Sequence, residues 1–313
     1  MIDLLLLVVG LGLLTFAADR FVLGAARLST ALRLAPVLIG ALVPNPITSA
    51  PELLVTTLAT VQGSQDLAFG NVVGSNTANV LLVLGAAALM SPLAVEAATL
   101  RREVPLMVGS VLLLALLTRD RSVSTLDAVL LLVAAVGVIG FIVWVGLRDR
   151  AAAARLEAEV AEYEHGDVKA LPSALLALAG LVGTLAGAQV LILGATGLAR
   201  TIGLSEAVIG LTIVAVGTSL PELVTAVAAA RRRETDLVVG NILGSNIFNS
   251  LPVAGAAGLL DTLELDPAFP ISLAVMVVAV VLTAVFLRTG ARLGRREGAV
   301  LLALFVVGTV VLF

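Results

Sequence analysis

The stretch Thr-Ser-Ala-Pro-Glu-Leu at residues 48–53 returns as Thr-Ser-Leu-Pro-Glu-Leu at residues 218–223, an offset of 170 positions. Each copy places a glutamate, Glu52 or Glu222, inside apolar sequence and directly after a proline. An ionisable side chain at the centre of a membrane-crossing helix costs about 2.5–3.5 kcal/mol on insertion scales. Since both copies keep this unfavourable residue, the repeat predicts two related halves that share a functional site.

A second repeated motif lies at the same offset, and no gap is needed to align it. Gly-Asn-Val-Val-Gly-Ser-Asn at 70–76 is followed by Asn79, and Gly-Asn-Ile-Leu-Gly-Ser-Asn at 240–246 is followed by Asn249. Low complexity alone does not produce this agreement, because the matching positions include Glu, Asp, Asn, Pro and Ser. The chain is therefore an internal duplication, which constrains the fold more than any single motif does.

The composition predicts an all-α integral membrane protein. Of the 313 residues, 59% are hydrophobic and only 13% are charged, whereas a soluble domain carries about 25% charged residues. The apolar residues lie in long runs, and a membrane-crossing helix needs about 20 of them. We expect about ten transmembrane helices as two inverted five-helix repeats, near 2–19, 34–61, 67–90, 103–118, 125–147, 171–189, 204–230, 237–259, 267–287 and 298–313.

The charged segment 148–170 divides the chain into a first repeat at 1–147 and a second repeat at 171–313, with five helices each. An odd number of spans gives the two repeats opposite orientations. With this connector in the cytoplasm and both termini outside, sixteen Lys and Arg residues lie inside and three lie outside, as the positive-inside rule requires. Inverted repeats are typical of secondary transporters, whose binding site lies near the bilayer midplane.

Several classes of protein are excluded by residues that the chain lacks. Without cysteine there are no disulfides and no thiolate metal sites. No basic tract with interleaved aromatic residues indicates binding to nucleic acid. The first apolar run has Asp3 and no basic residue before it, so we expect a retained first helix rather than a signal peptide. No cofactor and no protein partner are expected beyond the lipid bilayer.

The chemistry of the first motif favours a hard cation. Thr48 and Glu52 are four residues apart and share a helix face, as do Thr218 and Glu222. The two prolines that precede the glutamates have no N–H, so each frees a backbone carbonyl one turn earlier. Carboxylate, hydroxyl and carbonyl oxygens suit Ca²⁺, which takes six to eight oxygen ligands, or Na⁺. A transition metal would want imidazole or thiolate, and no predicted span contains His or Cys.

The second motif predicts a polar stripe that faces the centre of the bundle. Asn71, Ser75 and Asn79 follow each other at intervals of four residues, and the stripe returns as 241, 245 and 249. Such groups would be costly against lipid, while the glycines of the motif allow close helix packing. Asp66 and Asp236 are interpreted as helix N-caps rather than ligands.

These motifs resemble the sodium/calcium exchanger family of the cation/calcium antiporter superfamily, in its compact prokaryotic form. The resemblance spans nearly the whole chain, and its segments Gly-Thr-Ser-x-Pro-Glu and Gly-Asn-x-x-Gly-Ser-Asn are highly specific. It implies exchange of Na⁺ for Ca²⁺ across the plasma membrane by alternating access. It also implies a set of residues that bind these ions. They are Glu52, Glu222, Thr48, Ser49, Thr218 and Ser219, with Ser75, Ser245, Asn79 and Asn249 completing flanking Na⁺ sites or the central site.

The chain departs from the family pattern at two places. Many sodium/calcium exchangers have an acidic residue at the position of Asn249. Because this chain lacks it, the site has two carboxylates, Glu52 and Glu222, which are enough to neutralise one Ca²⁺. The first repeat reads Val-Pro-Asn-Pro-Ile at 43–47, where the second reads Ile-Val-Ala-Val-Gly at 213–217. Two prolines forbid a regular helix there, so we expect the first repeat to be less regular than the second.

Three other functions compete with Na⁺/Ca²⁺ exchange. In a proton-coupled Ca²⁺ antiporter of the same superfamily, Glu52 and Glu222 would release protons as Ca²⁺ binds. Relatives of that kind commonly have an acid in the second motif, where this chain has Gly-Ser-Asn. An intramembrane enzyme needs a positioned base or nucleophile, and the spans offer no His, Cys, Lys or Asp pair. A membrane scaffold would not explain equivalent buried acids in both halves.

Overall fold

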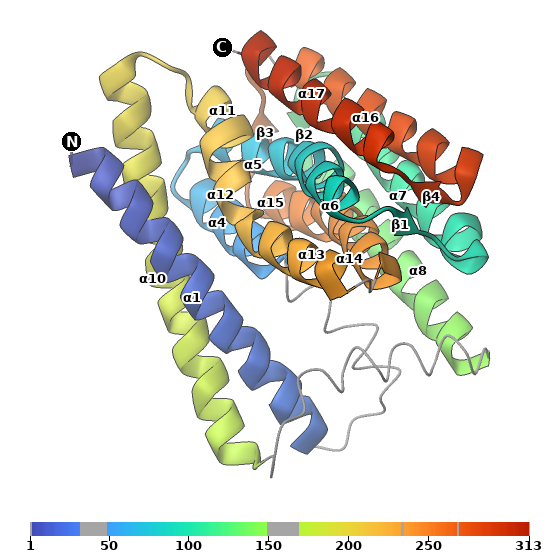
Figure 1. Cartoon of the computed structure of the whole chain (residues 1–313). Helices are drawn as coiled ribbons and strands as arrows, with labels where there is room; N and C mark the ends of the chain where they lie inside the picture. The colour runs from blue at the N-terminus through green and yellow to red at the C-terminus, as the bar shows by residue number, and fades with distance from the viewer. Residues whose placement is uncertain (1, 32–48, 149–168, 233–234, 268, 313) are drawn as a thin grey trace.

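The structure is a computed structural model, which describes residues 2–31, 49–148, 169–232, 235–267 and 269–312. Nearly all of them are helical (Figure 1). The first half holds α1 (Ile2–Ala31), α4 (Ala50–Val61), α5 (Gln65–Ala78), η1 (Asn79–Val83), α6 (Leu84–Met90), β1 (Leu93–Ala94), α7 (Ala97–Leu117), β2 (Ser122–Val123) and α8 (Thr125–Arg148). The second half holds α10 (Ala170–Ile202), α11 (Glu206–Ile209), η2 (Gly210–Val214), α12 (Ala215–Thr218), α13 (Leu220–Arg232), α14 (Thr235–Phe248), η3 (Asn249–Val253), α15 (Ala254–Leu260), β3 (Leu263–Glu264), α16 (Phe269–Gly290), β4 (Arg292–Leu293) and α17 (Arg295–Leu312).

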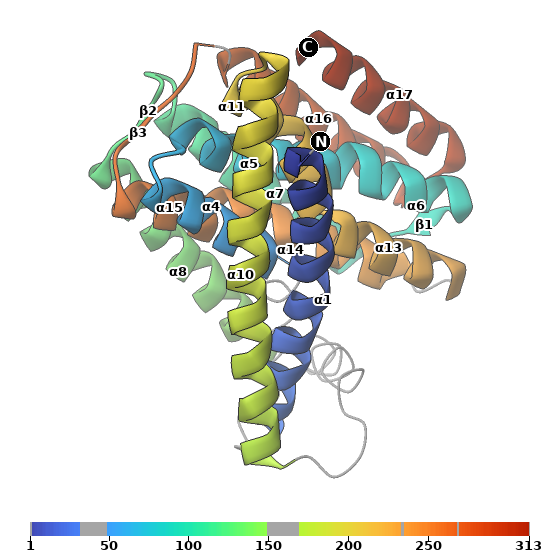
Figure 2. The same ribbon diagram turned by 90° about the vertical axis from the view of Figure 1, so that its left-hand side faces the viewer.

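Helices α1 and α10 form an antiparallel pair along one side of the molecule (Figure 2). Their backbones approach at glycines: a Cβ on Gly10 would overlap the backbone of Leu191, and one on Gly24 would overlap that of Ala177. From Gly10 to Gly24 the residue numbers rise along α1, while those of their contacts on α10 fall from Leu191 to Ala177, so the two helices run antiparallel. Small residues permit such an approach between membrane helices, where packing rather than hydrophobic burial drives association.

Both helices of this pair are longer than the sequence predicted. The expected spans 2–19 and 171–189 continue without a break to Ala31 and Ile202. The polar and basic residues that follow the two apolar runs end those runs, but both helices continue through them. The close α1–α10 packing supports the additional turns, because most helical stability in proteins comes from packing rather than from intrinsic propensity.

The helices that carry the two glutamates, α4 and α13, begin directly after equivalent serines. Ser49 has φ −90° and ψ 12°, and Ser219, which separates α12 from α13, has φ −85° and ψ 5°, so both lie outside the α-helical range. Each serine lies two residues before a proline, Pro51 or Pro221, which lacks an N–H and is tolerated in the first turn of a helix. The structure thus places each glutamate in the first turn of a new helix.

Two wider helical turns mark equivalent places in the second motif. The π-helical segment η1 begins at Asn79, and η3 begins at Asn249. In each, the N–H five residues ahead bonds the asparagine carbonyl, from Leu84 and Ala254 respectively. Such π turns recur at functional sites, and here they re-aim the asparagine side chains relative to the preceding α-helix.

Equivalent elements of the two halves pack against each other in a reciprocal way. Strand β1 pairs with β4, where Leu93 faces Leu293, and β2 pairs with β3, where Val123 faces Leu263. The offset of 170 residues converts one pair into the other. The helices behave likewise, since α6 packs on α17 as α15 packs on α8. These reciprocal contacts are those of a pseudo-twofold arrangement.

Because the chain has no cysteine, the two strand pairs between the halves can be tested by cross-linking. The double variants Leu93→Cys/Leu293→Cys and Val123→Cys/Leu263→Cys are expected to form disulfides under mild oxidation. Directly opposed residues of antiparallel strands have the Cα separation that a disulfide needs. Mass spectrometry after alkylation measures the yield. The mismatched variant Leu93→Cys/Val123→Cys is the control; equal cross-linking in it would refute the strand register.

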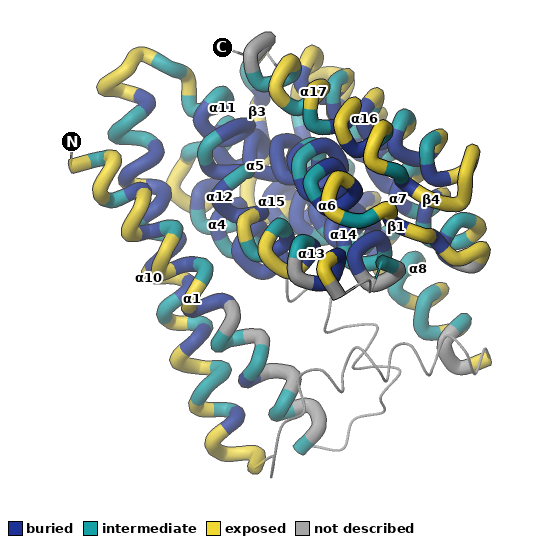
Figure 3. The backbone as a smooth tube through the Cα atoms, viewed as in Figure 1, coloured by how far each residue is buried: buried dark blue, intermediate teal, exposed yellow. Residues whose placement is uncertain are grey.

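Many large apolar side chains lie on the outer surface, while the polar side chains of the two motifs lie inside. Figure 3 shows buried residues concentrated on α5, α12 and α14, and exposed large hydrophobic side chains include Leu5, Val133, Leu175 and Val278. Within the described residues, five helices are long and apolar enough to cross a membrane, and Ile2–Ala18 and Ala50–Val61 are shorter apolar helices. The fold is therefore that of a helical membrane protein, and ten spans remain a prediction.

Two sequence-based expectations lie outside the described residues. They are the irregular stretch at 43–47 and most of the charged connector at 148–170.

Candidate cation site

Glu52 is fully buried in the first turn of α4. Its Oε1 accepts a hydrogen bond of 3.4 Å from the Ser219 hydroxyl. Its Oε2 has no partner among the described residues. Since Ser219 belongs to the second repeat, the carboxylate of one half accepts a hydrogen bond from a hydroxyl group of the other half.

Asn71 of α5 holds this arrangement together with four hydrogen bonds. Its Nδ2 donates to the Glu52 carbonyl at 3.3 Å and to the Thr56 hydroxyl at 3.0 Å. Its Oδ1 accepts from the Thr218 hydroxyl at 3.0 Å and from the Ser75 hydroxyl at 3.5 Å. The amide thereby uses its full capacity and positions the oxygens of both repeats beside the carboxylate.

Glu222, the repeat equivalent of Glu52, is fully buried in the first turn of α13. Neither of its carboxylate oxygens has a hydrogen-bond partner among the described residues, and it interacts electrostatically with Glu52. The buried hydroxyl of Ser49, the equivalent of Ser219, is also without a described partner. A buried carboxylate without a partner is strongly unfavourable, so this arrangement calls for a positive charge.

Asn79 and Asn249, the asparagines that follow the second motif, lie at the start of the π turns. Asn79 Nδ2 donates to Asn246 Oδ1 at 3.0 Å, and Asn246 Nδ2 donates to the carbonyl of Asn76 at 3.2 Å. Asn79 Oδ1 and both polar atoms of the Asn249 side chain have no partner within the described part of the chain, although both residues are fully buried. Segment η1 packs against α13, which carries Glu222, and η3 packs against α4, which carries Glu52.

Nine of the ten residues that the sequence proposed as cation ligands are described, and all nine are buried. They are Ser49, Glu52, Ser75, Asn79, Thr218, Ser219, Glu222, Ser245 and Asn249. Thr48 lies outside the described residues. The Ser75 hydroxyl is 3.3 Å from that of Thr218, so members from both motifs and both repeats come together.

Five further polar residues join the network although they were not among the proposed ligands. They are Asn71, Asn76, Asn246, Ser250 and Thr56, and Asn76 Nδ2 donates to Ser250 Oγ at 3.2 Å. Asn71 belonged to the predicted polar stripe. Asn76 and Asn246 occupy equivalent positions of the two repeats but do not belong to that stripe. Ser250 carries no repeat signal, because its equivalent in the first half is Val80.

The interpretation of Asp66 as an N-cap is wrong. Asp66 lies in the first turn of α5, but the cap position is Ser64. Asp66 Oδ1 accepts a hydrogen bond of 2.9 Å from the backbone N–H of Asp266. It therefore ties the start of α5 to the segment after β3 in the other half, a long-range contact that sequence patterns do not show. The side chain of Asp236 is outside the described residues.

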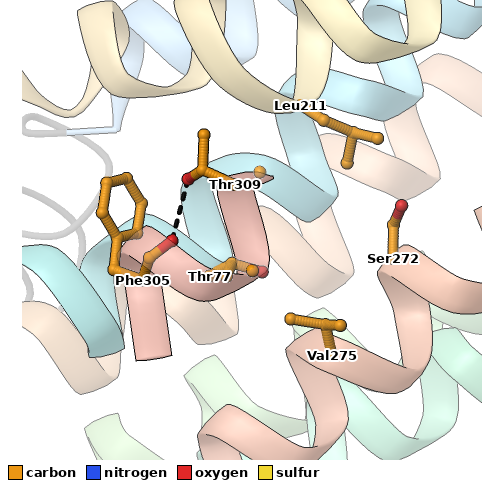
Figure 4. A pocket seen from close by; sticks show the side chains of 8 residues that line it. Thr77, Leu211, Ser272, Val275, Phe305 and Thr309 are labelled. Atoms are coloured by element: carbon orange, nitrogen blue, oxygen red, sulfur yellow. Dashed lines mark hydrogen bonds between the residues drawn. The ribbon is translucent and has the colours of Figure 1, made fainter. Parts of the chain in front are cut away.

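A separate small hollow lies between α5, η2, α16 and α17 (Figure 4). Its lining is apolar or hydroxylic, with Thr77, Ser272 and Thr309 as the side-chain polar groups. Thr309 donates to the Phe305 carbonyl at 2.8 Å, whereas the Ser272 hydroxyl has no described partner. Because no charged residue lines it, this hollow lacks the carboxylates that the candidate cation site has.

The family model for the sodium/calcium exchanger protein matches residues 2–144 and 172–313. These ranges take in both halves and omit the connector. The chain belongs to the sodium/calcium exchanger family. Members of this family are membrane transporters that exchange ions, so the chain is an antiporter of cations and not an enzyme.

Individual members of the family agree over nearly the full length. The putative antiporter CaxA of Alkalimonas amylolytica is 38% identical, over 95% of this chain and 94% of CaxA. The sodium/calcium exchanger MaX1 of Methanosarcina acetivorans is 32% identical, over 100% of this chain and 99% of MaX1. The structure also matches that of the sodium-calcium exchanger NCX_Mj soaked with Na⁺ and Ca²⁺, with a TM-score of 0.67 and 29% identity over 99% of this chain and 98% of NCX_Mj.

In this exchanger family member, removal of one hydroxyl should weaken cation binding measurably. Ser219→Ala is expected to raise the Ca²⁺ concentration for half-maximal uptake about 10–150-fold, because a hydrogen bond to a charged group is worth about 1.5–3 kcal/mol. Uptake into proteoliposomes over a range of Ca²⁺ concentrations gives the value. The matched control is Ser110→Ala, whose hydroxyl is also buried but donates to Leu106 of its own helix. Equal effects of the two variants would contradict the assignment.

Proposed function

We propose that this protein exchanges Na⁺ for Ca²⁺ across the plasma membrane of a prokaryote by alternating access, with Glu52 and Glu222 in one cation site. The observation that carries the proposal is the pair of fully buried carboxylates in the first turns of the equivalent helices α4 and α13. The motif resemblance and the names of the similar exchangers support the choice of ions. The ions are the transported substrates, and ten residues are proposed as their ligands: the nine buried ones named above and Thr48.

The chemistry of exchange follows from competition for the same two acids. Two carboxylates that interact in a water-poor interior repel each other, and a cation between them removes that penalty. Ca²⁺ offers two charges to two carboxylates, and hydroxyl and amide oxygens complete its coordination. Na⁺ occupies the same oxygens in its place. Because both ions need Glu52 and Glu222, the site holds one kind of ion or the other when its access changes from one side of the membrane to the other. This competition couples the movements of the two ions.

The membrane arrangement belongs to the same proposal. Ten spans, divided as 1–147 and 171–313, cross as inverted repeats, and the connector at 148–170 faces the cytoplasm with both termini outside. The support is the asymmetry of sixteen against three basic residues. Cysteines introduced at Arg155 and Arg232 are expected to resist an impermeant thiol reagent in intact cells and to react after permeabilisation. Rapid labelling of both in intact cells would overturn this topology.

Uptake of ⁴⁵Ca²⁺ into proteoliposomes tests the function. Vesicles loaded with Na⁺ are diluted into Na⁺-free medium, parallel vesicles carry an outward H⁺ gradient instead, and a K⁺ ionophore holds the voltage equal. Na⁺-driven accumulation above that of gradient-free and protein-free vesicles is the expected result. Uptake that follows the H⁺ gradient alone would instead identify the proton-coupled alternative, and uptake that follows neither gradient would refute antiport of Ca²⁺.

A further inference from the structure

Three buried asparagines at the contact between the repeats form a relay of hydrogen bonds that ends on a backbone carbonyl. Asn246 Nδ2 donates to the carbonyl of Asn76 at 3.2 Å, and Asn79 Nδ2 donates to Asn246 Oδ1 at 3.0 Å. All three side chains are fully buried. Because Asn76 and Asn79 belong to the first repeat and Asn246 to the second, this asparagine relay joins the two halves of the chain.

The carbonyl at the end of the relay fixes the orientation of each amide group. A backbone carbonyl only accepts hydrogen bonds, so Asn246 has to turn its Nδ2 toward Asn76. Its Oδ1 then faces Asn79, and this acceptor requires the Nδ2 of Asn79 opposite it. The Oδ1 of Asn79 is thereby left without a partner among the described residues. It lies at the start of η1, which packs against α13, the helix of Glu222.

The equivalent relay around Asn249 is not formed by these described residues. The offset of 170 positions would join Asn249 to Asn76, and the elements that carry them, η3 and α5, do pack against each other. However, Asn76 Nδ2 donates to the Val72 carbonyl at 3.1 Å and to Ser250 Oγ at 3.2 Å. Asn76 Oδ1 and both polar atoms of the Asn249 side chain have no partner in the described part of the chain.

Ser250 accounts for this difference between the repeats. The carbonyl that Asn76 uses in its own helix, that of Val72, has its equivalent in Ile242, one turn before Asn246. This contact is therefore open to both asparagines and does not distinguish them. The residue equivalent to Ser250 is Val80, which has no hydroxyl group and cannot hold Asn246 as Ser250 holds Asn76.

From these contacts, and resting on the function proposed above, we infer that Asn246 is a positioning residue for cation binding. It fixes Asn79 with its oxygen free for the ion, while Ser250 holds Asn76 away from the equivalent bond to Asn249. An amide binds a cation through its oxygen, and a ligand already held in its binding orientation loses less entropy when the ion arrives. Asn79 is thus oriented in advance, whereas Asn249 has to orient its amide each time an ion binds.

Replacement of Asn246 by Ala tests the relay. Without this acceptor Asn79 can turn its Nδ2 toward the ion, so the Ca²⁺ concentration for half-saturation should rise about 3–10-fold, the effect of about one hydrogen bond. Equilibrium binding of ⁴⁵Ca²⁺ to the purified protein in Na⁺-free detergent solution measures it. The maximal rate of uptake into proteoliposomes should change less than the half-saturating concentration, because a positioning role acts on binding.

Asn76→Ala is the matched comparison, because it removes a buried amide with two hydrogen bonds at the equivalent position of the first repeat. The two variants should lose similar thermal stability in detergent. The side chain of Asn76 bonds neither Asn79 nor Asn249, so its removal should shift the half-saturating concentration less than Asn246→Ala does. Equal shifts would overturn the inference, since the loss of any buried amide would then explain both.

Ser250→Ala has the opposite expected result. It releases Asn76, whose Oδ1 can then accept from Asn249 Nδ2 and orient Asn249 as Asn246 orients Asn79. The half-saturating Ca²⁺ concentration should therefore fall about 2–3-fold. An unchanged or higher concentration would refute the role of Ser250. This variant loses a single hydroxyl group, so it also decides the matter if Asn246→Ala does not fold.

Binding in detergent separates this inference from the proposed function, because it needs no ion gradient. If Asn246→Ala binds Ca²⁺ as the parent does while Na⁺-driven uptake persists, the inference is wrong and the function stands. If the variants shift binding as described but no gradient drives uptake, the function is wrong and the positioning role of Asn246 stands. A parent protein that does not bind Ca²⁺ would refute both.

Discussion

Replacement of Glu222 by Gln is expected to reduce Ca²⁺ uptake at least about 100-fold while leaving the protein folded. The substitution keeps the shape of the side chain and removes one of the two buried charges that face the ion. Removal of one partner from a buried ion pair costs about 3–5 kcal/mol, which corresponds to at least about 100-fold in binding. Uptake of ⁴⁵Ca²⁺ into proteoliposomes measures the loss. Glu52→Gln should have an effect of the same size, because the two residues are repeat equivalents.

The control for this prediction is the same substitution at Glu264, an exposed residue of strand β3 that faces Ser122. Glu264→Gln should transport Ca²⁺ within about twofold of the parent, as surface substitutions usually change little. Thermal unfolding of all variants in detergent separates loss of function from loss of fold. A folded Glu222→Gln protein that transports at the parent rate would refute the proposed site.

Substitution of Gly10 by Val is expected to have the largest effect on stability. A Cβ at this position would overlap the backbone of Leu191, which cannot move away as a flexible side-chain tip could. Overpacking of this kind costs about 1–3 kcal/mol, so the unfolding midpoint in detergent should fall by about 2–10 °C. Gly180→Val should behave in the same way, because its Cβ would meet the backbone of Phe21 at the equivalent crossing.

A matched control lies two residues away on the same helix. Gly12 is exposed, and a Cβ there would have no heavy atom within 4 Å. Gly12→Val should therefore leave the midpoint unchanged or raise it slightly, since glycine is a poor helix former. If both variants lower the midpoint equally, the cause is helix propensity rather than the α1–α10 crossing.

Much of the site was predictable because duplication makes chemistry visible in a sequence. A buried glutamate that recurs at one repeat position must be compensated in both halves, and Glu52 and Glu222 are indeed fully buried. The prolines that follow Ser49 and Ser219 predicted an interruption of helical hydrogen bonding, and the helices α4 and α13 begin directly after these two serines. Both inferences depend on local properties, namely charge and the missing N–H of proline.

The lengths of α1 and α10 were not predictable in this way. The apolar runs at 2–19 and 171–189 end well before the helices do. Hydropathy reports which residues suit lipid, whereas helix length here follows from packing between two segments far apart in the chain. For the same reason Asp66, which suggested an N-cap, instead accepts the N–H of Asp266 in the other half.

By itself the sequence determined the helical membrane class, the duplication and the two buried acids, because composition, offset and residue chemistry are properties of the chain alone. Only the tertiary structure decided which residues of one half contact the candidate ligand residues of the other half. It places Ser219 of the second repeat on Glu52 of the first, with Asn71 as the bridge. It also leaves Asn249 without a described partner. Such contacts depend on how the two repeats cross and interlock, and that geometry is set by packing across the pseudo-twofold arrangement rather than by any local pattern.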